Sequence, residues 1–207
     1  INVTSSSHRG WFSCMLKESK QFSSMSKTNR KLEIYCRGAF NALNAQREYY
    51  DPNDEDIVRY CTKSIFYSAV FDCQYGCTGL VSEEARYLPN KKRTWDHLNS
   101  PQRVGHFVMD NMEIYLNDYE KFRDIFIWAC TQILVTKVEN TKLKQLTINT
   151  AGEELRILVP TDKKYEHLGI RLCKRPGNKG AYKNAILTDE TIPVPQEYLN
   201  WEKQFIV

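Results

Sequence analysis

The hydrophobic pattern of the chain changes near residue 149, and this change limits the folds that the chain can adopt. From Lys31 to residue 146, apolar residues recur mostly at spacings of three and four, which predicts amphipathic helices. After Asn149 the pattern becomes short apolar runs separated by turn residues, as in "ELRILVP", "GIRLCKRPGNKG" and "NAILTD". The order indicates an α+β fold, with a helical N-terminal two-thirds and a small strand-rich C-terminal part.

Two local signals place helix starts within this pattern. Pro101 follows a serine, and a proline in the first turn of a helix loses no hydrogen bond, so a helix is expected to begin there. Thr136 and Glu139 have the spacing of a capping box and predict a second helix start. Val138, Leu143 and Leu146 are expected to form the buried face of that helix.

The length and composition are sufficient for an ordered globule. The chain has 207 residues, of which 42% are hydrophobic and 12% aromatic, and disordered chains are poor in such residues. Residues 31–207 are therefore expected to form one domain. Residues 1–30 are polar and rich in serine and lysine, which predicts a weakly ordered N-terminal segment.

The net charge and the length of the apolar runs restrict the classes of protein to which the chain can belong. The net charge of +4 is compatible with nucleic-acid binding, although many ordinary proteins are as basic. No apolar run reaches the ~20 residues of a membrane span, and the N-terminal residues do not have the pattern of a signal peptide. An intracellular protein without a membrane partner is the expectation.

The seven cysteines argue against a disulfide framework, because their number is odd and they are scattered over the chain. A reducing compartment follows. Cys73 and Cys77 form a close pair, but a structural zinc ion needs four ligands and there is no second close pair. Buried apolar cysteines are therefore preferred to a zinc site.

The segment "RTWDHLNSPQRVGHF", residues 93–107, carries the main candidate site. An aspartate directly before a histidine suits phosphodiester hydrolysis, since a neutral histidine can deprotonate water near pH 7. The carboxylate of Asp96 can hold Mg²⁺ or Mn²⁺, which prefer oxygen ligands. Asp96 is thus expected to bind the metal and His97 to act as the general base, while a solvated turn remains the plain alternative.

Other residues near this pair are secondary candidates. Asn99 and His106 are expected to assist catalysis, and His106 and Asp110, which lie four residues apart on the expected helix, to complete the metal site. Basic residues at two places in the chain are expected to contact the DNA backbone. These are Lys91, Lys92, Arg93 and Arg103 near the pair, and Lys174, Arg175 and Lys179 on a hairpin tip.

Three segments together resemble small phage-encoded homing endonucleases of the HNH (ββα-metal) kind. They are "RTWDHLNSPQ", "ILVTKVENTKL" and "KYEHLGIRL", and the resemblance covers residues 70–172. In that family an Asp-His pair near a proline supplies the metal ligand and the general base. The resemblance implies a magnesium-dependent endonuclease with double-stranded DNA as its partner, working in the cytoplasm of the host cell, and it allows a homodimer.

The sequence departs from the family pattern after His97. The family has a β-hairpin there, with an asparagine in its loop and a third histidine or asparagine on the following helix. Here the helix signals begin three residues after the histidine, so Asn99 or Asn111 would be the middle asparagine. His106 or Asp110 would then supply the last ligand.

Two further classes of function compete with the nuclease. A non-catalytic nucleic-acid-binding protein would use its lysines, arginines and tyrosines to hold the backbone and stack on bases. A purely structural protein would show no salt-dependent affinity for DNA.

Overall fold

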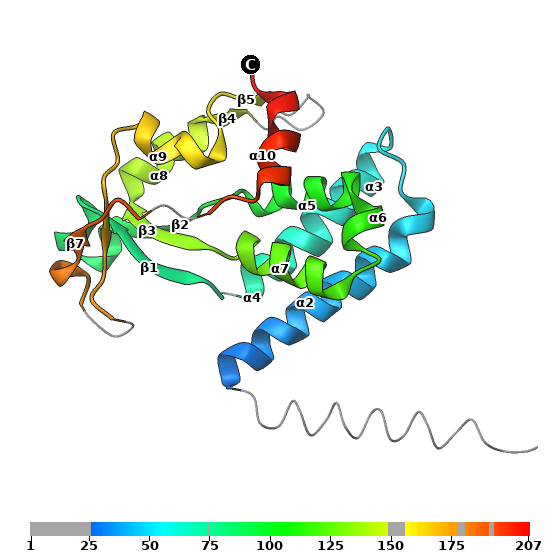
Figure 1. Ribbon diagram of the computed structural model, residues 1–207, viewed down its shortest axis with the longest axis horizontal. Helices are drawn as coiled ribbons and strands as arrows, with labels where there is room; N and C mark the ends of the chain where they lie inside the picture. Colours follow the sequence, from blue (N-terminus) through cyan, green and yellow to red (C-terminus); the bar gives the residue numbers. More distant parts are fainter. Residues whose placement is uncertain (1–25, 74, 149–155, 178–180, 191–192) are drawn as a thin grey trace, which may run out of the picture.

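A helical region and a mixed β-sheet lie side by side in the computed structural model (Figure 1). The structure describes residues 26–73, 75–148, 156–177, 181–190 and 193–207. The N-terminal segment expected to be weakly ordered therefore lies outside the described residues, except for Ser26, which caps the first helix, and residues 27–30, which begin it.

The helices precede, interrupt and follow the strands of the sheet. The helices are α2 (Lys27–Gln46), α3 (Glu55–Arg59), a π-helix (Tyr60–Tyr67), α4 (Ser68–Cys73), α5 (Pro101–Asp110), α6 (Met112–Tyr115), α7 (Tyr119–Ala129), α8 (Lys137–Gln145), α9 (Lys164–His167) and α10 (Gln196–Glu202). The strands are β1 (Cys77–Ser82), β2 (Arg93–His97), β3 (Gln132–Thr136), β4 (Thr147–Ile148), β5 (Arg156–Ile157), β6 (Leu172–Lys174) and β7 (Ile186–Leu187).

The sheet has the strand order β2-β3-β1-β6-β7. Strand β3 pairs antiparallel with β2 and parallel with β1, while β6 pairs antiparallel with β1 and β7. Successive side chains of a strand face opposite sides, and in β3 Ile133 packs toward α8 while Leu134 packs on the other face. Both faces are buried, so the strand has a nearly continuous apolar sequence.

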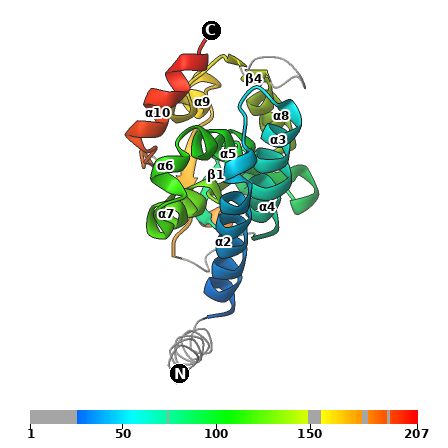
Figure 2. The same cartoon turned by 90° about the vertical axis from the view of Figure 1, so that its right-hand side faces the viewer.

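Close packing of α5 on the π-helix organises the helical region, in which α2 lies between α7 and α4 in Figure 2 and extends beyond them at its N-terminal end. A Cβ atom at Gly105 would lie 3.1 Å from the backbone of Thr62 and 3.3 Å from the Cβ atom of Phe66. Glycine therefore permits a helix separation that a larger residue would increase. This contact holds the π-helix, and with it Tyr67, next to the start of α5.

The C-terminal helix α10 joins the helical region to the segment before α9. Tyr198 and Trp201 are buried among the aromatic side chains of the main core. The buried carboxylate of Glu202 accepts hydrogen bonds from Thr161 N (2.9 Å), Thr161 Oγ1 (2.6 Å) and Arg103 Nη1 (3.1 Å). The buried charge is thus compensated by donors from two separate segments.

The α+β class is confirmed, but the strands are not confined to the C-terminal part of the chain. Strands β1, β2 and β3 come from the middle of the chain, between the helices. Asp96 and His97, for which a solvated turn was the plain alternative, lie instead in β2 at the edge of the sheet. The helix starts at Pro101 and after Thr136 are confirmed, whereas Val138 is 66% exposed rather than buried.

None of the helices in the described part of the chain is long and apolar enough to cross a membrane.

Candidate functional site

Strands β2 and β3 and helix α8 form a strand–strand–helix unit. The strands pair antiparallel from Arg93 opposite Thr136 to His97 opposite Gln132. Helices α5, α6 and α7 occupy the connection between the two strands, in place of the short turn of a hairpin. Helix α8 follows β3 directly, so the unit has the order β, β, α with a long helical insertion.

The capping box fixes α8 to the end of β3. Thr136 Oγ1 accepts from Glu139 N (3.0 Å), and the Glu139 carboxylate accepts from Thr136 N (2.7 Å). The same carboxylate oxygen accepts a hydrogen bond from Ser82 Oγ (2.6 Å) at the end of β1. These bonds set the rotation of α8 and turn Asn140, the next residue, toward β2.

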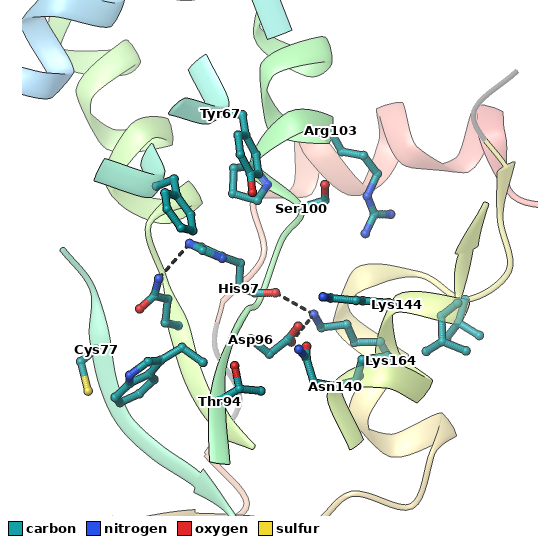
Figure 3. A pocket seen from close by; sticks show the side chains of 17 residues that line it. Tyr67, Cys77, Thr94, Asp96, His97, Ser100, Arg103, Asn140, Lys144 and Lys164 are labelled. Atoms are coloured by element: carbon teal, nitrogen blue, oxygen red, sulfur yellow. Dashed lines mark hydrogen bonds and ion pairs between the residues drawn. The ribbon is translucent and has the colours of Figure 1, made fainter. Parts of the chain in front are cut away.

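A cavity of about 850 Å³ surrounds β2 (Figure 3). Its volume lies within the ~300–1,000 Å³ range of small-molecule sites. On one side of the strand, Asn140 and Lys164 lie beside Asp96, while the His97 side chain points to the other side. The polar lining includes Asp96 and His97 from β2, Arg103 from α5, Asn140 and Lys144 from α8, and Lys164 from α9.

Asp96 is buried in the cavity wall and accepts two short hydrogen bonds at one carboxylate oxygen. Its Oδ2 accepts from Lys164 Nζ (2.7 Å) and from Tyr165 Oη (2.6 Å). Burial, and then the charge of Asp96, raise the pKa of Tyr165, so the phenol keeps its proton and donates. No described residue donates to Oδ1, which leaves one carboxylate oxygen for another partner.

Lys164 connects the two residues of the pair. Besides its bond to Asp96, its Nζ donates to the main-chain oxygen of His97 (2.8 Å). Burial lowers the pKa of Lys164, and the charge and hydrogen bond of Asp96 oppose this shift. The lysine therefore holds the strand end and neutralises the carboxylate at the same time.

The surroundings of His97 favour the neutral form of its imidazole. Burial lowers the pKa of its imidazole, and the charge of Asp96 only partly opposes the shift. Gln132 Nε2 donates to His97 Nε2 (2.9 Å), so the proton of the neutral ring is on Nδ1. The lone pair of Nε2 can accept a proton from water only after the amide of Gln132 moves away.

The secondary site residues are not brought together with the pair. The described residues contain no cluster of three histidine, cysteine, aspartate or glutamate side chains, so Asp96, His106 and Asp110 do not form the expected metal site. Asp110 accepts a hydrogen bond from Trp201 Nε1 (2.8 Å) instead. Asn99 is buried without a side-chain partner among the described residues, and neither it nor His106 lines the cavity.

The expected DNA-binding residues are likewise divided. Arg103 lines the cavity, but Lys91, Lys92 and Arg93 do not, because they lie at the opposite end of β2 from His97. The basic residues of the hairpin tip have local partners: Lys174 binds Glu190 (2.8 Å), and the Arg175 guanidinium lies 4.9 Å from the Tyr182 ring centroid. Lys179 lies outside the described residues.

Cys73 and Cys77 point to different partners. Cys73 is buried with Cys130 in the main core, and Cys77 lies at the start of β1 with its Sγ 3.3 Å from Tyr182 Oη. The close pair in the sequence thus does not act as one unit.

Asn140 and Lys144 are site residues that sequence reasoning missed. Both belong to the segment "VENTKLK" that follows Thr136, within the region of resemblance. The family pattern, with a final asparagine or histidine on a helix, would have pointed to Asn140 once β3 was recognised as the second strand. The chain matches no protein-family model, and no curated protein or solved structure is significantly similar to it.

Proposed function

We propose that the protein is a divalent-metal-dependent endonuclease that hydrolyses phosphodiester bonds in DNA. The observation that carries this proposal is the cavity in which the β2–β3–α8 unit collects Asp96, His97 and Asn140. A carboxylate and an amide oxygen can hold a divalent ion, and a neutral imidazole can act as the general base of such hydrolysis. The order of the elements also agrees with the HNH (ββα-metal) resemblance.

The residues of the site fit a magnesium or manganese ion. Asp96 Oδ1 and the amide oxygen of Asn140 would hold it, since Mg²⁺ takes one or two protein oxygens and keeps several waters. The bound ion would polarise the phosphate and stabilise the leaving oxygen. Lys164 and Tyr165 would orient Asp96 through its other oxygen, as outer partners of metal ligands commonly do.

The remaining roles belong to side chains of the chain itself. Lys144 would bind a phosphate oxygen of the DNA backbone from the basic side of the cavity, where Arg103 would add positive charge while it stays paired with Glu202. His97 would accept the proton of the attacking water at Nε2, after the water replaces the Gln132 amide there. Its lowered pKa favours this role because the ring is neutral under physiological conditions.

A non-catalytic DNA-binding protein is the second candidate. The observation that favours it is the pairing of Asp96 with Lys164 and Tyr165, which balances the carboxylate charge without a metal. In this reading the same cations hold the backbone and no bond is cleaved.

Cleavage of plasmid DNA separates the two candidates. The wild type is expected to cut with Mg²⁺ or Mn²⁺ and not with EDTA, and Asn140→Ala to need more metal for the same rate. Asn140→Asp is expected to need less, because a carboxylate binds Mg²⁺ more strongly than an amide does. Lys142→Ala, on the exposed face of α8, is the control and should behave as the wild type. DNA binding without cutting under any condition would favour the second candidate.

A further inference from the structure

Aromatic side chains form the other wall of the cavity. Tyr67 ends the π-helix and Phe71 follows four residues later on α4. Their rings are stacked, with centroids 6.0 Å apart and an angle of 13° between the planes. Phe71 is 53% exposed, and Trp95 on β2, which also lines the cavity, is 41% exposed. Flat apolar rings are thus left open to whatever enters.

The aromatic wall and the basic wall belong to one continuous cavity. The His97 side chain lies on the aromatic side of β2, below Tyr67 in Figure 3, and the cations Lys144 and Lys164 lie on the other side. A ligand over the end of β2 therefore meets positive charge on one side and stacked rings on the other. A nucleotide has this division, with an anionic phosphate at one end and a flat base at the other.

A base in a regular duplex does not present its face to a protein. Both faces are covered by neighbouring bases, so a protein ring can stack only on a base that has left the helix or lies in a single strand. The stacked rings, which lie across β2 from Lys144 and Lys164 in the same cavity, thus select for an unpaired nucleotide.

We propose that Tyr67 and Phe71 form a base-binding subsite, and that the substrate is a DNA strand with an unpaired nucleotide beside the phosphate held at Asp96 and His97. This inference deepens the proposed nuclease function and narrows its substrate from double-stranded DNA in general to unpaired positions. The π-helix contributes by directing Tyr67 into the cavity, and such helices recur at functional sites.

Fluorescent oligonucleotides test the subsite without any cleavage. A single strand with one 2-aminopurine, and the same strand in a full duplex, are titrated with protein in EDTA. The wild type is expected to bind the single strand at least tenfold more tightly than the duplex, and to quench its fluorescence on binding. Phe71→Ala is expected to weaken single-strand binding by roughly tenfold and to leave duplex binding unchanged.

Two further variants complete the design. Phe71→Leu keeps an apolar side chain without an aromatic face, and it should weaken single-strand binding as Phe71→Ala does if stacking is the cause. Tyr49→Ala removes an exposed tyrosine that is not part of the cavity lining and should change neither affinity. Thermal melts show whether each variant is folded.

The outcomes for the subsite and for the nuclease are distinct. Equal effects of Phe71→Ala on both DNAs, or equal wild-type affinity for both, would overturn the subsite. Mg²⁺-dependent cutting of fully paired DNA that Phe71→Ala does not affect would also overturn it, while supporting the nuclease. Quenching that depends on Phe71 in a protein that never cuts would support the subsite and refute the nuclease.

Discussion

The two sides of β2 differ in how far apart in the sequence their residues lie. On the polar side, Asp96 is held by Lys164 and Tyr165, which lie 68 and 69 positions later. On the aromatic side, Tyr67 and Phe71 are four residues apart on one helical stretch. The polar side therefore depends on the assembly of distant segments, because a buried carboxylate is stable only with partners. The aromatic side depends mainly on a local helix. Substitutions on that side should therefore leave the fold intact.

The largest effect is expected on the chemical step. His97→Ala should lower the rate of cleavage at saturating Mg²⁺ by about 10²–10⁴-fold, the usual cost of losing a general base. Affinity for DNA in EDTA should stay close to that of the wild type. Single-turnover kinetics measure the rate of cleavage, and a binding titration measures the affinity for DNA. A folded His97→Ala protein with full activity would remove the histidine from the mechanism.

The next largest effect is expected on the free energy of unfolding, which should respond differently to substitutions on the two sides of β2. Lys164→Met leaves the charge of Asp96 without its ionic partner and should lower the free energy of unfolding by about 3–5 kcal/mol. Phe71→Ala, at a half-exposed position, should cost far less. Urea denaturation measures both, and Lys163→Met is the matched control because its ion pair with Glu166 is exposed. A loss no greater than that of the control would mean that the Asp96–Lys164 pair contributes little.

The pH dependence of cleavage should follow His97. Its pKa is lowered by burial, so the rate should rise with pH through a midpoint below the ordinary value of about 6.5 and then stay level. The sign follows because the imidazolium, which forms at low pH, cannot accept a proton. This acidic limb should be absent from the residual activity of His97→Ala. A midpoint above 6.5 would contradict the effect of burial.

The smallest effects concern the outer cations. Lys144→Ala should reduce the salt dependence of duplex binding by about 0.9 in the slope of log K against log salt, the value for one lost phosphate contact. Lys91→Ala and Lys92→Ala should leave this slope unchanged, since neither side chain reaches the cavity. Titrations at several salt concentrations decide the matter. If only Lys91→Ala and Lys92→Ala reduced the slope of log K against log salt, the DNA backbone would instead contact the end of β2 opposite His97.

The parts of the site that could be predicted from the sequence are those set by neighbours in the chain. The capping box of Thr136 and Glu139 was predicted because its atoms lie within four residues. The Asp-His pair was noticed for the same reason. Strand β2 was missed, because its pairing with β3 spans the three helices between them and leaves no local periodicity.

The remaining site residues can be recognised only from the tertiary structure. Lys144 is one of several lysines on a polar helix until α8 is placed beside β2. Asn140 is similarly inconspicuous, and Lys164 has no sequence signal that connects it with Asp96. Asp110 shows the converse, since its helical spacing from His106 could be predicted, whereas its hydrogen-bond partner, Trp201, comes from a segment 91 positions later.

The hydrogen bonds of Glu202 affect the order in which the molecule can mature during synthesis. Arg103 is 99 positions before its carboxylate partner, so the guanidinium reaches its final place only when α10 has left the ribosome. A nascent chain that already has β2, β3 and α8 thus has an unfinished cavity. Helix α10 thus completes the basic wall of the cavity only after the β2–β3–α8 unit has been synthesised.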